Sequence, residues 1–474
     1  NFYHEKDGVR GENVLSSGGL FKLGELTLGF VGVMTPETFS KSAPAYFQDE
    51  NGEFIYGLSG GDTGEELQAD VQKAIDSARA QGADLVIGLG HLGLDSASEP
   101  WTSATTLSNI SGMDAFIDGH SHTECEHSTI TDKDGESVVL VQTGEYFHNI
   151  GLMIIDAETH EIKTELIGYN ELTEKGTDEN GEETDVVVGY ELVSELYTGA
   201  KWPVDEQTAE LKNNWITTIE ESLGVVIATT ELTFDNYDAE GNRISRKQAT
   251  NSGDLAADAL YWLFDDMGMN VDVAITNAGG LRNKAITGEI TYTLCKSMHT
   301  FGNHACLRTV TGQQLLDALE WGARGIGFDD DIGAFMQVSG ITFSIDPTIE
   351  PTSVCDEYEM WVSGPTGEYK VQDVQVYNKK TNAYEPLDLE AKYNLSGYDT
   401  FLTKAVDGYT MFDGTAVVMD HAMEDYLVLA NYFTAFEGGV IEATNSPLLA
   451  KYPNMLLDYS DVNGSGRITI LPAE

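Results

Sequence analysis

Two apolar segments that each end in a Gly-His pair constrain the fold of this chain more than any other feature. One reads ADLVIGLGHLG and the other reads MDAFIDGHSHTE. Each is a short apolar run that stops at a glycine, which is typical of a buried strand. Open α/β sheets bind ligands beyond the carboxyl ends of their strands. The sequence therefore predicts an α/β fold in which His91, His120 and His122 belong to one site.

These three histidines suit a metal site. Imidazole is neutral near physiological pH and offers one lone pair, and the preceding glycines let the backbone approach an ion closely. A single loop histidine is more often a surface residue, but two such endings, one of them His-x-His, favour metal ligation. Three imidazoles can hold one zinc, whereas a two-metal hydrolytic centre also needs carboxylate or amide ligands. Asp118 is expected to support the loop rather than to coordinate.

The charge of the chain excludes several classes of partner. Its 474 residues include 26 basic and 78 acidic side chains, for a net charge of -52, and 41% are hydrophobic. That length and hydrophobic content predict two or three domains with real cores. Such a negative field disfavours nucleic-acid polymers and anionic membrane surfaces. No apolar run is long enough for a membrane span. The acidity itself is typical of a soluble chain or of one adapted to a salty or extracellular setting.

The periodicity predicts a first domain at residues 1–170 that alternates strands with helices. An amphipathic helix is expected at 64–84, and a hairpin is expected around the Asp-Gly pair at 134–135. Residues 171–224 are predicted to be an acidic connector followed by a linker helix at 205–224. The four cysteines have no metal-binding spacing. Unpaired thiols are expected, with a Cys295–Cys306 pair as the alternative.

The remaining residues, 225–474, are predicted to form a second α/β domain. Its first helix is expected at 251–268, capped by Asn251 or Ser252, and a buried strand at 271–283 should run into a Gly-Gly turn. Residues 290–312 look rich in strands, a helix should follow at 313–325, and the tail looks rich in β-structure.

The turn Asn277-Ala-Gly-Gly-Leu-Arg282 is a candidate anion site. The alternative is an ordinary glycine turn with a surface arginine, which is common. Because this chain has few cations, an arginine at a strand end is a plausible clamp for phosphate or carboxylate.

Together these segments resemble the 5'-nucleotidase family of two-domain metallophosphoesterases. VIGLGHLG, IDGHSHT and NAGGLR occur in the family's order, with a linker helix between the second and the third. FVGVMTPET, VQTGEYFHNIG and QVSGITFSID read like its connecting segments. The resemblance implies a metallophosphoesterase α/β sandwich, a linker helix and an α/β C-terminal domain. It also implies two divalent metal ions, zinc, manganese or similar, with His91 and His120 on one and His122 on the other.

The resemblance further implies a nucleotide site in the second domain. Asn277 and Arg282 would bind the substrate with help from Arg246, which fits better than Arg243. Two aromatic residues would sandwich the base, an asparagine would hydrogen-bond it, and an aspartate would hold the ribose. The set of substrate-binding residues is Arg246, Asn277, Gly280, Arg282, Phe301, Asn303, Tyr409 and Asp413. The segment AVDGY departs from the family's GGDGF or GGDGY by one glycine.

The chain also departs from the family before its first residue. The DxH, GDxxxG and GNHE segments that complete the family's metal site are not in this sequence. GGDTGEE at 60–66 resembles GDxxxG, but it follows the expected position and opens a helix, so it is rejected. The sequence is therefore expected to be an amino-terminally incomplete form with a partial metal site. No catalytic residue is assigned, because the family's His-Asp pair belongs upstream, and a separate amino-terminal fragment is a possible partner.

The predicted function is metal-dependent removal of phosphate from nucleotides in nucleotide catabolism, at an extracellular, cell-surface or periplasmic location. Cyclic 2',3'-nucleotides and nucleotide sugars are alternative substrates. The rival hypotheses are a non-catalytic nucleotide- or nucleoside-binding protein and a polymer-binding surface module.

Overall fold

The computed structural model describes residues 1–6, 9–16, 18–42, 47–49, 54–61, 63–177, 183–195, 197, 199–283, 285–328, 332–356 and 358–472. Two compact units share them: unit 1 contains 1–38 and 47–214, and unit 2 contains 39–46 and 215–474. Mixed helices and sheets in both units confirm the α/β class. The predicted domain boundaries at 170 and 224 stay a prediction. Asp62 of the GGDTGEE segment and residues 178–182 of the predicted connector lie outside the described residues.

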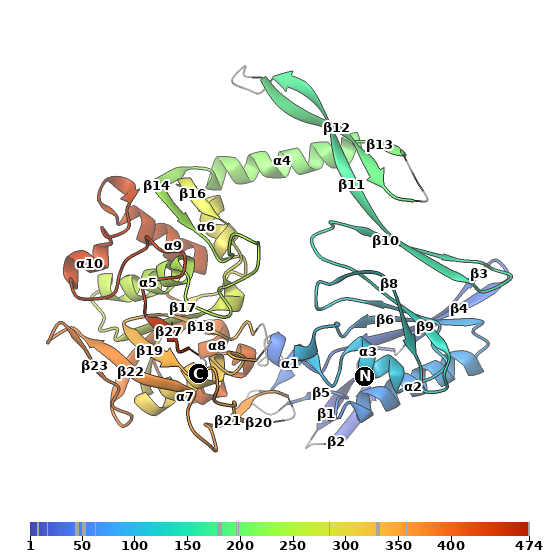
Figure 1. Cartoon of the computed structure of the whole chain (residues 1–474), viewed down its shortest axis with the longest axis horizontal. Helices are drawn as coiled ribbons and strands as arrows, with labels where there is room; N and C mark the ends of the chain where they lie inside the picture. Colours follow the sequence, from blue (N-terminus) through green and yellow to red (C-terminus); the bar gives the residue numbers. More distant parts are fainter. Residues whose placement is uncertain are drawn as a thin grey trace. The chain divides into compact units, whose positions relative to one another are not determined.

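Unit 1 is built on a six-stranded sheet of order β3-β4-β6-β7-β9-β8 (Figure 1). Its four inner strands are parallel, and the edge strands β3 and β8 are antiparallel to their neighbours. The elements of unit 1 are β1 (Phe2–Lys6), β2 (Val9–Asn13), β3 (Gly18–Leu23), β4 (Leu26–Met34), β5 (Tyr56–Leu58), α2 (Glu65–Ala80), β6 (Leu85–His91), η2 (Ser96–Ser98), α3 (Ser103–Ser108), β7 (Ala115–Asp118), β8 (Glu124–Thr131), β9 (Ser137–Thr143), β10 (Ile150–Ile155), β11 (Ile162–Thr177), β12 (Glu183–Val193) and β13 (Lys201–Pro203).

The two faces of this sheet carry separate cores, because successive side chains of a strand point to opposite sides. Val31 and Val86 belong to the core under α2, whose buried face is Leu67, Val71, Ile75 and Ala78. Leu28 and Leu85 are an odd number of positions from Val31 and Val86 in the same strands, so they point to the other face. They belong to the core against which β10 and β11 pack. The predicted helix at 64–84 and the strand and hairpin segments around it are thus confirmed.

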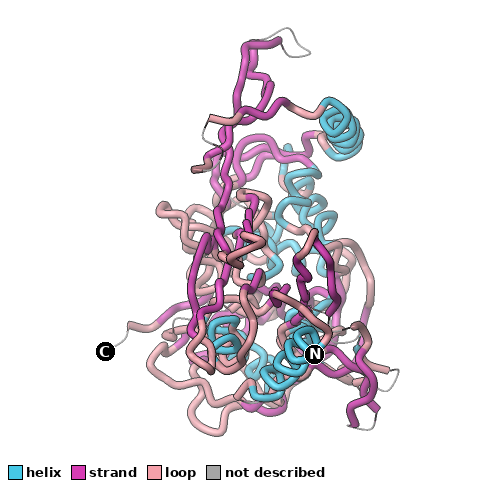
Figure 2. The backbone as a smooth tube through the Cα atoms, turned by 90° about the vertical axis from the view of Figure 1, so that its right-hand side faces the viewer, coloured by secondary structure: helices cyan, strands magenta, loops and turns pink. Residues whose placement is uncertain are grey.

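The predicted connector is different in the structure. β11 and β12 pair in antiparallel register as a long ribbon, which continues the sheet order β10-β11-β12-β13 (Figures 1 and 2). β11 contains three Thr residues and β12 contains four Val residues, and these residue types favour extended backbone over a solvated coil. The helix predicted at 205–224 is α4 (Glu206–Leu223), and it carries no buried residue.

Unit 2 holds a five-stranded sheet of order β18-β15-β24-β17-β25 and a four-stranded sheet of order β23-β22-β19-β27. Its elements are β14 (Val226–Phe234), α5 (Asn251–Asp266), β15 (Val273–Asn277), η3 (Ala278–Gly280), β16 (Ile286–Thr291), α6 (Tyr292–Met298), β17 (Ala305–Thr311), α7 (Gly312–Gly322), β18 (Met336–Ser339), β19 (Ile341–Ile345), β20 (Val354–Cys355), β21 (Trp361–Ser363), β22 (Val371–Asn378), β23 (Ala383–Pro386), β24 (Lys392–Tyr398), α8 (Asp399–Leu402), η4 (Val406–Gly408), η5 (Thr410–Phe412), β25 (Ala416–Met419), α9 (Asp425–Thr434), η6 (Glu437–Gly439), β26 (Val440–Ile441), α10 (Pro447–Lys451) and β27 (Ile468–Ile470).

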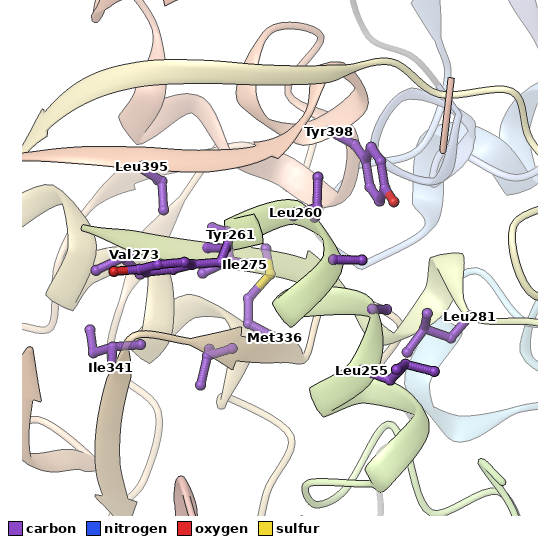
Figure 3. Close-up of a cluster of buried hydrophobic side chains, with 14 of the residues drawn as sticks. Leu255, Leu260, Tyr261, Val273, Ile275, Leu281, Met336, Ile341, Leu395 and Tyr398 are labelled. Atoms are coloured by element: carbon purple, nitrogen blue, oxygen red, sulfur yellow. The ribbon is translucent and has the colours of Figure 1, made fainter. Parts of the chain in front are cut away.

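Helix α5 is the centre of the unit 2 core. Leu255 and Leu260 of this helix belong to the same buried cluster as Ile275 of β15 and Met336 of β18, and Leu255 lies beside Leu281 (Figure 3). The helix is capped by Thr250, whose hydroxyl accepts a hydrogen bond from the Gly253 amide at 3.0 Å, and not by Asn251 or Ser252. The buried strand predicted before the Gly-Gly turn is confirmed as β15, whose first four residues are buried.

The segment predicted as rich in strands contains helix α6 between β16 and β17. Thr291 caps this helix by accepting a hydrogen bond from the Leu294 amide, which outweighs the strand preference of its Thr residues. Cys295 and Cys306 are buried free thiols, as expected, and Cys125 and Cys355 are also free. Within the described part of the chain, no helix combines the length and the apolarity that a membrane span needs.

Candidate metal and nucleotide sites

The predicted metal ligands of unit 1 lie at one edge of the sheet, at the carboxyl ends of neighbouring parallel strands. His91 is the last residue of β6, and His120 and His122 follow β7, which pairs with β6. The rings of His91 and His120 have centroids 5.0 Å apart. Glu37 follows β4 and Glu145 follows β9 at the same edge of the sheet. Parallel pairing thus places these side chains at one edge.

Asp118 fixes the two histidine loops to each other. Its carboxylate accepts hydrogen bonds from the amides of Leu92 at 2.9 Å and Gly93 at 3.0 Å. Gly119 is also needed, because a Cβ there would lie 2.8 Å from Nδ1 of His91. Asp118 is therefore a supporting residue in this structure, as its sequence position predicted.

Each histidine of the second loop has a carboxylate partner that the sequence did not reveal. Nε2 of His120 lies 2.9 Å from Oε2 of Glu37, whose side chain is 2% exposed. Nδ1 of His122 lies 2.6 Å from Oε2 of Glu145. A carboxylate on one ring nitrogen orients an imidazole and leaves the other nitrogen for a metal ion. Among 78 acidic residues, the only sequence signal for Glu37 was its place after a strand.

The donor set fits a divalent ion in part. Burial lowers the pKa of His91, and His120 and His122 lower it further while Asp118 opposes them. A neutral His91 keeps the lone pair that a metal requires. Among the described residues, however, the three histidines do not bring three ligand atoms within 4.8 Å of one another. The assignment of His91 and His120 to one ion stays a prediction, and the side chain of His122 is 54% exposed.

Both loop histidines have a left-handed backbone, with φ of 83° at His120 and 55° at His122. Residues other than glycine rarely adopt this conformation, and they do so mostly where the surrounding structure holds them. The hydrogen bonds from the Leu94 amide to the Ser121 hydroxyl at 3.0 Å and from the Thr123 amide to Gln142 at 2.7 Å provide that hold.

In unit 2, the predicted glycine turn follows β15 as the short helix η3. The Asn277 amide group donates a hydrogen bond to Asp407 at 3.0 Å. Arg243 donates to the carbonyl groups of Ala278 at 3.0 Å and of Leu281. A Cβ at Gly280 would lie 2.9 Å from the Asn277 side-chain oxygen, so glycine allows this close approach.

Arg282 and Phe301 lie together beside this turn. The guanidinium of Arg282 is 4.9 Å from the ring centroid of Phe301, which is 55% exposed. Nε of Arg282 is buried and makes no hydrogen bond within the described residues, so it is a donor available to an anionic group. Arg246 lies near the same turn, because both flank Gly333. A Cβ at Gly333 would be 3.4 Å from Cα of Gly279 in the turn and 3.9 Å from the guanidinium carbon of Arg246.

Asn303 lies two residues beyond Phe301 in the loop before β17. Its backbone amide donates to Asp425 at 2.9 Å, and the Asp425 amide donates back to the Asn303 carbonyl at 2.8 Å. Burial raises the pKa of Asp425 to about 6, although the hydrogen bonds that its carboxylate accepts from the Asn303 and Tyr426 amides act in the opposite direction. The backbone of the loop is therefore fixed at Asn303 through both its amide and its carbonyl group.

The structure does not join Tyr409 and Asp413 to this group. The Tyr409 ring is fully buried and stacks on Phe412, and its hydroxyl donates to the Ala334 carbonyl at 2.6 Å. A ring in that position offers no face to a base. Asp413 is exposed at the end of η5, with no hydrogen bond to Asn277 or Arg282 among the described residues. From the same segment, Asp407 reaches the site instead.

Part of unit 2 matches a known protein family. The model of the family described as "5'-nucleotidase, C-terminal domain" matches residues 226–414. The trifunctional nucleotide phosphoesterase protein of Bacillus subtilis is 23% identical over 72% of this chain. The Treponema pallidum protein named "Probable 5'-nucleotidase" is 23% identical over 84% of this chain. The chain spans 20% and 66% of the lengths of these two relatives.

Solved structures agree on the fold. The crystal structure of a 5'-nucleotidase precursor from Thermus thermophilus matches with a TM-score of 0.64 at 22% identity. The match covers 97% of this chain and 75% of that one. This chain therefore shares the fold of that protein, with the matched C-terminal domain at residues 226–414.

Proposed function

We infer the function of this chain from its family, since it belongs to the 5'-nucleotidase family and carries that family's C-terminal domain at residues 226–414. The proposed activity is metal-dependent hydrolysis of phosphate from nucleotides. Nucleoside 5'-monophosphates are the proposed first substrates, and 2',3'-cyclic nucleotides and nucleotide sugars are the alternatives. The proposed location is extracellular or at the cell surface, where a net charge of -52 favours solubility.

One observation carries the substrate side of this proposal. Arg282 presents a buried Nε donor without a hydrogen bond in the described structure, beside the exposed ring of Phe301. A guanidinium suits a phosphate group, and an aromatic ring suits a nucleobase of any kind. Asn277, Gly280, Arg246 and Asn303 are proposed to complete the binding site. Tyr409 and Asp413 keep their predicted roles only if the loop around η4 and η5 rearranges.

On the metal side, His91 and His120 are proposed to hold one divalent ion and His122 a second. Bound divalent ions would neutralise phosphoryl oxygens and lower the pKa of a bound water. The chain's own contribution is orientation, because Glu37 holds His120, Glu145 holds His122 and Asp118 holds both loops. No residue of this chain is assigned as the group that contacts the transferred phosphoryl.

The experiment separates binding from turnover. Calorimetric titration with AMP should show binding that weakens about 10- to 100-fold in Arg282→Ala, as expected for loss of a charge-assisted hydrogen bond. Lys392→Ala is the matched control, because Lys392 is an exposed cation of unit 2. Phosphate release from AMP with added Mn²⁺ or Zn²⁺ then tests the chemistry. Unchanged AMP affinity in Arg282→Ala would remove the site assignment.

The second candidate is a nucleotide-binding protein that does not hydrolyse its ligand. The observation that favours it is that three ligand atoms from His91, His120 and His122 do not converge within 4.8 Å in the described residues. This candidate predicts AMP binding that depends on Arg282, with no phosphate release under any divalent ion. Phosphate release that is abolished by His120→Ala would exclude it.

A further inference from the structure

We propose that unit 2 contains a separate transition-metal site formed by His304, Asp399 and His421. One ligand atom from each of these residues lies within 4.8 Å of the others. The proposal does not depend on the hydrolytic function or on the histidines of unit 1. Two imidazoles with one carboxylate suit Zn²⁺, Co²⁺, Ni²⁺ or Fe²⁺ better than Ca²⁺ or Mg²⁺, which prefer oxygen ligands.

The sheet topology brings these three residues to one edge. β17 lies between β24 and β25 and runs antiparallel to both. His304 precedes β17, Asp399 follows β24, and His421 follows β25, so all three stand at the same end of three adjacent strands. Asp399 lies 95 residues after His304 along the chain, and His421 lies further on. The sequence therefore shows no local metal-binding motif.

Backbone hydrogen bonds fix the three positions before any ion binds. The His304 amide donates to Oδ1 of Asp399 at 2.9 Å, and the Asp399 amide donates to the His304 carbonyl at 2.9 Å. The Ala422 amide, next to His421, donates to the Ala305 carbonyl at 2.9 Å. A site on strand ends that are tied together in this way is preorganised.

The side chains leave the ligand atoms turned toward one another. The His304 and His421 rings have centroids 5.1 Å apart, and Nε2 of His421 lies 3.8 Å from Oδ2 of Asp399. The Asp399 side chain is 1% exposed, and the charged partner of its Oδ2 is the Lys404 ammonium at 3.0 Å. Ligands bound to one tetrahedral zinc lie about 3.3 Å apart, given Zn–N distances near 2.0 Å. A small rotation of the exposed His421 ring therefore closes the site.

A second carboxylate supports His421 from behind. Oδ1 of Asp420 lies 3.2 Å from Nδ1 of His421. A proton on Nδ1 held by that carboxylate leaves the Nε2 lone pair for an ion, which is the arrangement found behind most metal-bound histidines. Because His304 follows Asn303 directly, a bound ion would also hold the loop that carries Asn303 and Phe301.

A substitution at Lys404 should strengthen metal binding, whereas substitutions of the ligands should weaken it. The Lys404 ammonium lies 3.0 Å from Oδ2 of Asp399, where it competes with a metal ion for that oxygen. If the cluster were only an ion pair, removing this cation would have no benefit for any bound ion. If the cluster is a metal site, Lys404→Met should bind a divalent cation about five-fold more tightly.

The experiment uses the full chain with His91, His120 and His122 replaced by Ala, so that only the proposed site contributes. Co²⁺ is the probe, because its visible absorption reports coordination by imidazole, and dialysis followed by metal analysis counts the bound ions. One bound Co²⁺ per chain is expected, displaced by Zn²⁺. His421→Ala should abolish binding, and Asp420→Asn should weaken it about 10- to 100-fold.

The control is His160→Asn, which removes an exposed histidine of unit 1. Circular dichroism on each variant checks that the fold is kept; His421 is 58% exposed, so its removal should leave the fold intact. Absence of Co²⁺ binding would overturn the proposal. Three other results would also overturn it. They are Co²⁺ binding that persists in His421→Ala, an equal loss of binding in His160→Asn and His421→Ala, and weaker binding in a folded Lys404→Met variant.

Discussion

Nε2 of His120 lies 2.9 Å from Oε2 of Glu37, a carboxylate that is only 2% exposed. A buried carboxylate behind a metal-binding histidine sets the orientation of its ring and raises its basicity. We therefore expect Glu37→Gln to weaken binding of Mn²⁺ or Zn²⁺ in unit 1 about 10- to 100-fold. Calorimetric titration of the variant and the parent protein measures this.

Glu145→Gln, which removes the more exposed of the two supporting carboxylates, should have a weaker effect than Glu37→Gln. His122 and Glu145 are 54% and 38% exposed, and exposed ion pairs contribute little. Its expected effect is smaller than about five-fold. Equal metal affinity in Glu37→Gln and the parent protein would show that Glu37 does not position a ligand.

Gly119 permits the ring of His91 to lie against its backbone, since a Cβ there would be 2.8 Å from Nδ1. The ring is the end of a side chain that can turn, so Gly119→Ala should displace the ring and leave the sheet intact. We expect at least about 10-fold weaker metal binding, with a shift of the His91 signals in ring-nitrogen NMR spectra. Gly32→Ala is the control, because a Cβ at Gly32 meets nothing within 4 Å. Unmoved His91 signals in Gly119→Ala would contradict the prediction.

The sequence predicted strand ends better than it predicted partners. His91 and His120 could be predicted at strand ends because each follows a glycine at the end of an apolar run, and His122 lies two residues after His120 in the same loop. Parallel sheets bring such strand ends to one edge. Glu37 could not be found, because its contact with His120 joins residues 83 positions apart and depends on the pairing of β4 with β6. Strand order is a tertiary property that local patterns do not contain.

The nucleotide site shows the same limit. The turn between Asn277 and Arg282 could be predicted from its glycines, whereas the burial of Tyr409 could not. An aromatic residue after a glycine can face solvent or core, and here the hydroxyl of Tyr409 finds the Ala334 carbonyl inside the protein. α6 was missed for a related reason: Thr291 acts as a helix cap in a segment whose Thr residues favour strands.

Arg467 joins the end of the chain to helix α5 through a fully buried ion pair. Its guanidinium lies 2.8 Å from Asp258, and both side chains are 0% exposed. Burial raises the pKa of Asp258, and Arg467 opposes that shift. Arg467→Met should lower the free energy of unfolding by about 3–5 kcal/mol, because it leaves a buried carboxylate without its cation.

Urea denaturation measures that loss, with Lys392→Met as an exposed control. Adding Asp258→Asn to Arg467→Met should recover part of the stability, since one of the two buried carboxylates beside Arg467 is then a neutral amide and only that of Asp254 remains. A double variant less stable than the sum of the two single effects would argue against the ion pair as the cause.

His299 makes the stability of unit 2 depend on pH. The ring is 2% exposed, and burial lowers the pKa of His299 to about 3 from its ordinary value near 6.5. Between these values the unfolded state binds a proton that the folded state does not, so stability falls as the pH is lowered from about 6.5 toward 3. The slope due to this one group approaches about 1.4 kcal/mol per pH unit. His299→Phe should remove that part of the slope, whereas His160→Asn, at an exposed histidine, should keep it. Urea denaturation from pH 7 to pH 4 measures the three curves, and parallel curves for His299→Phe and the parent protein would refute the assignment.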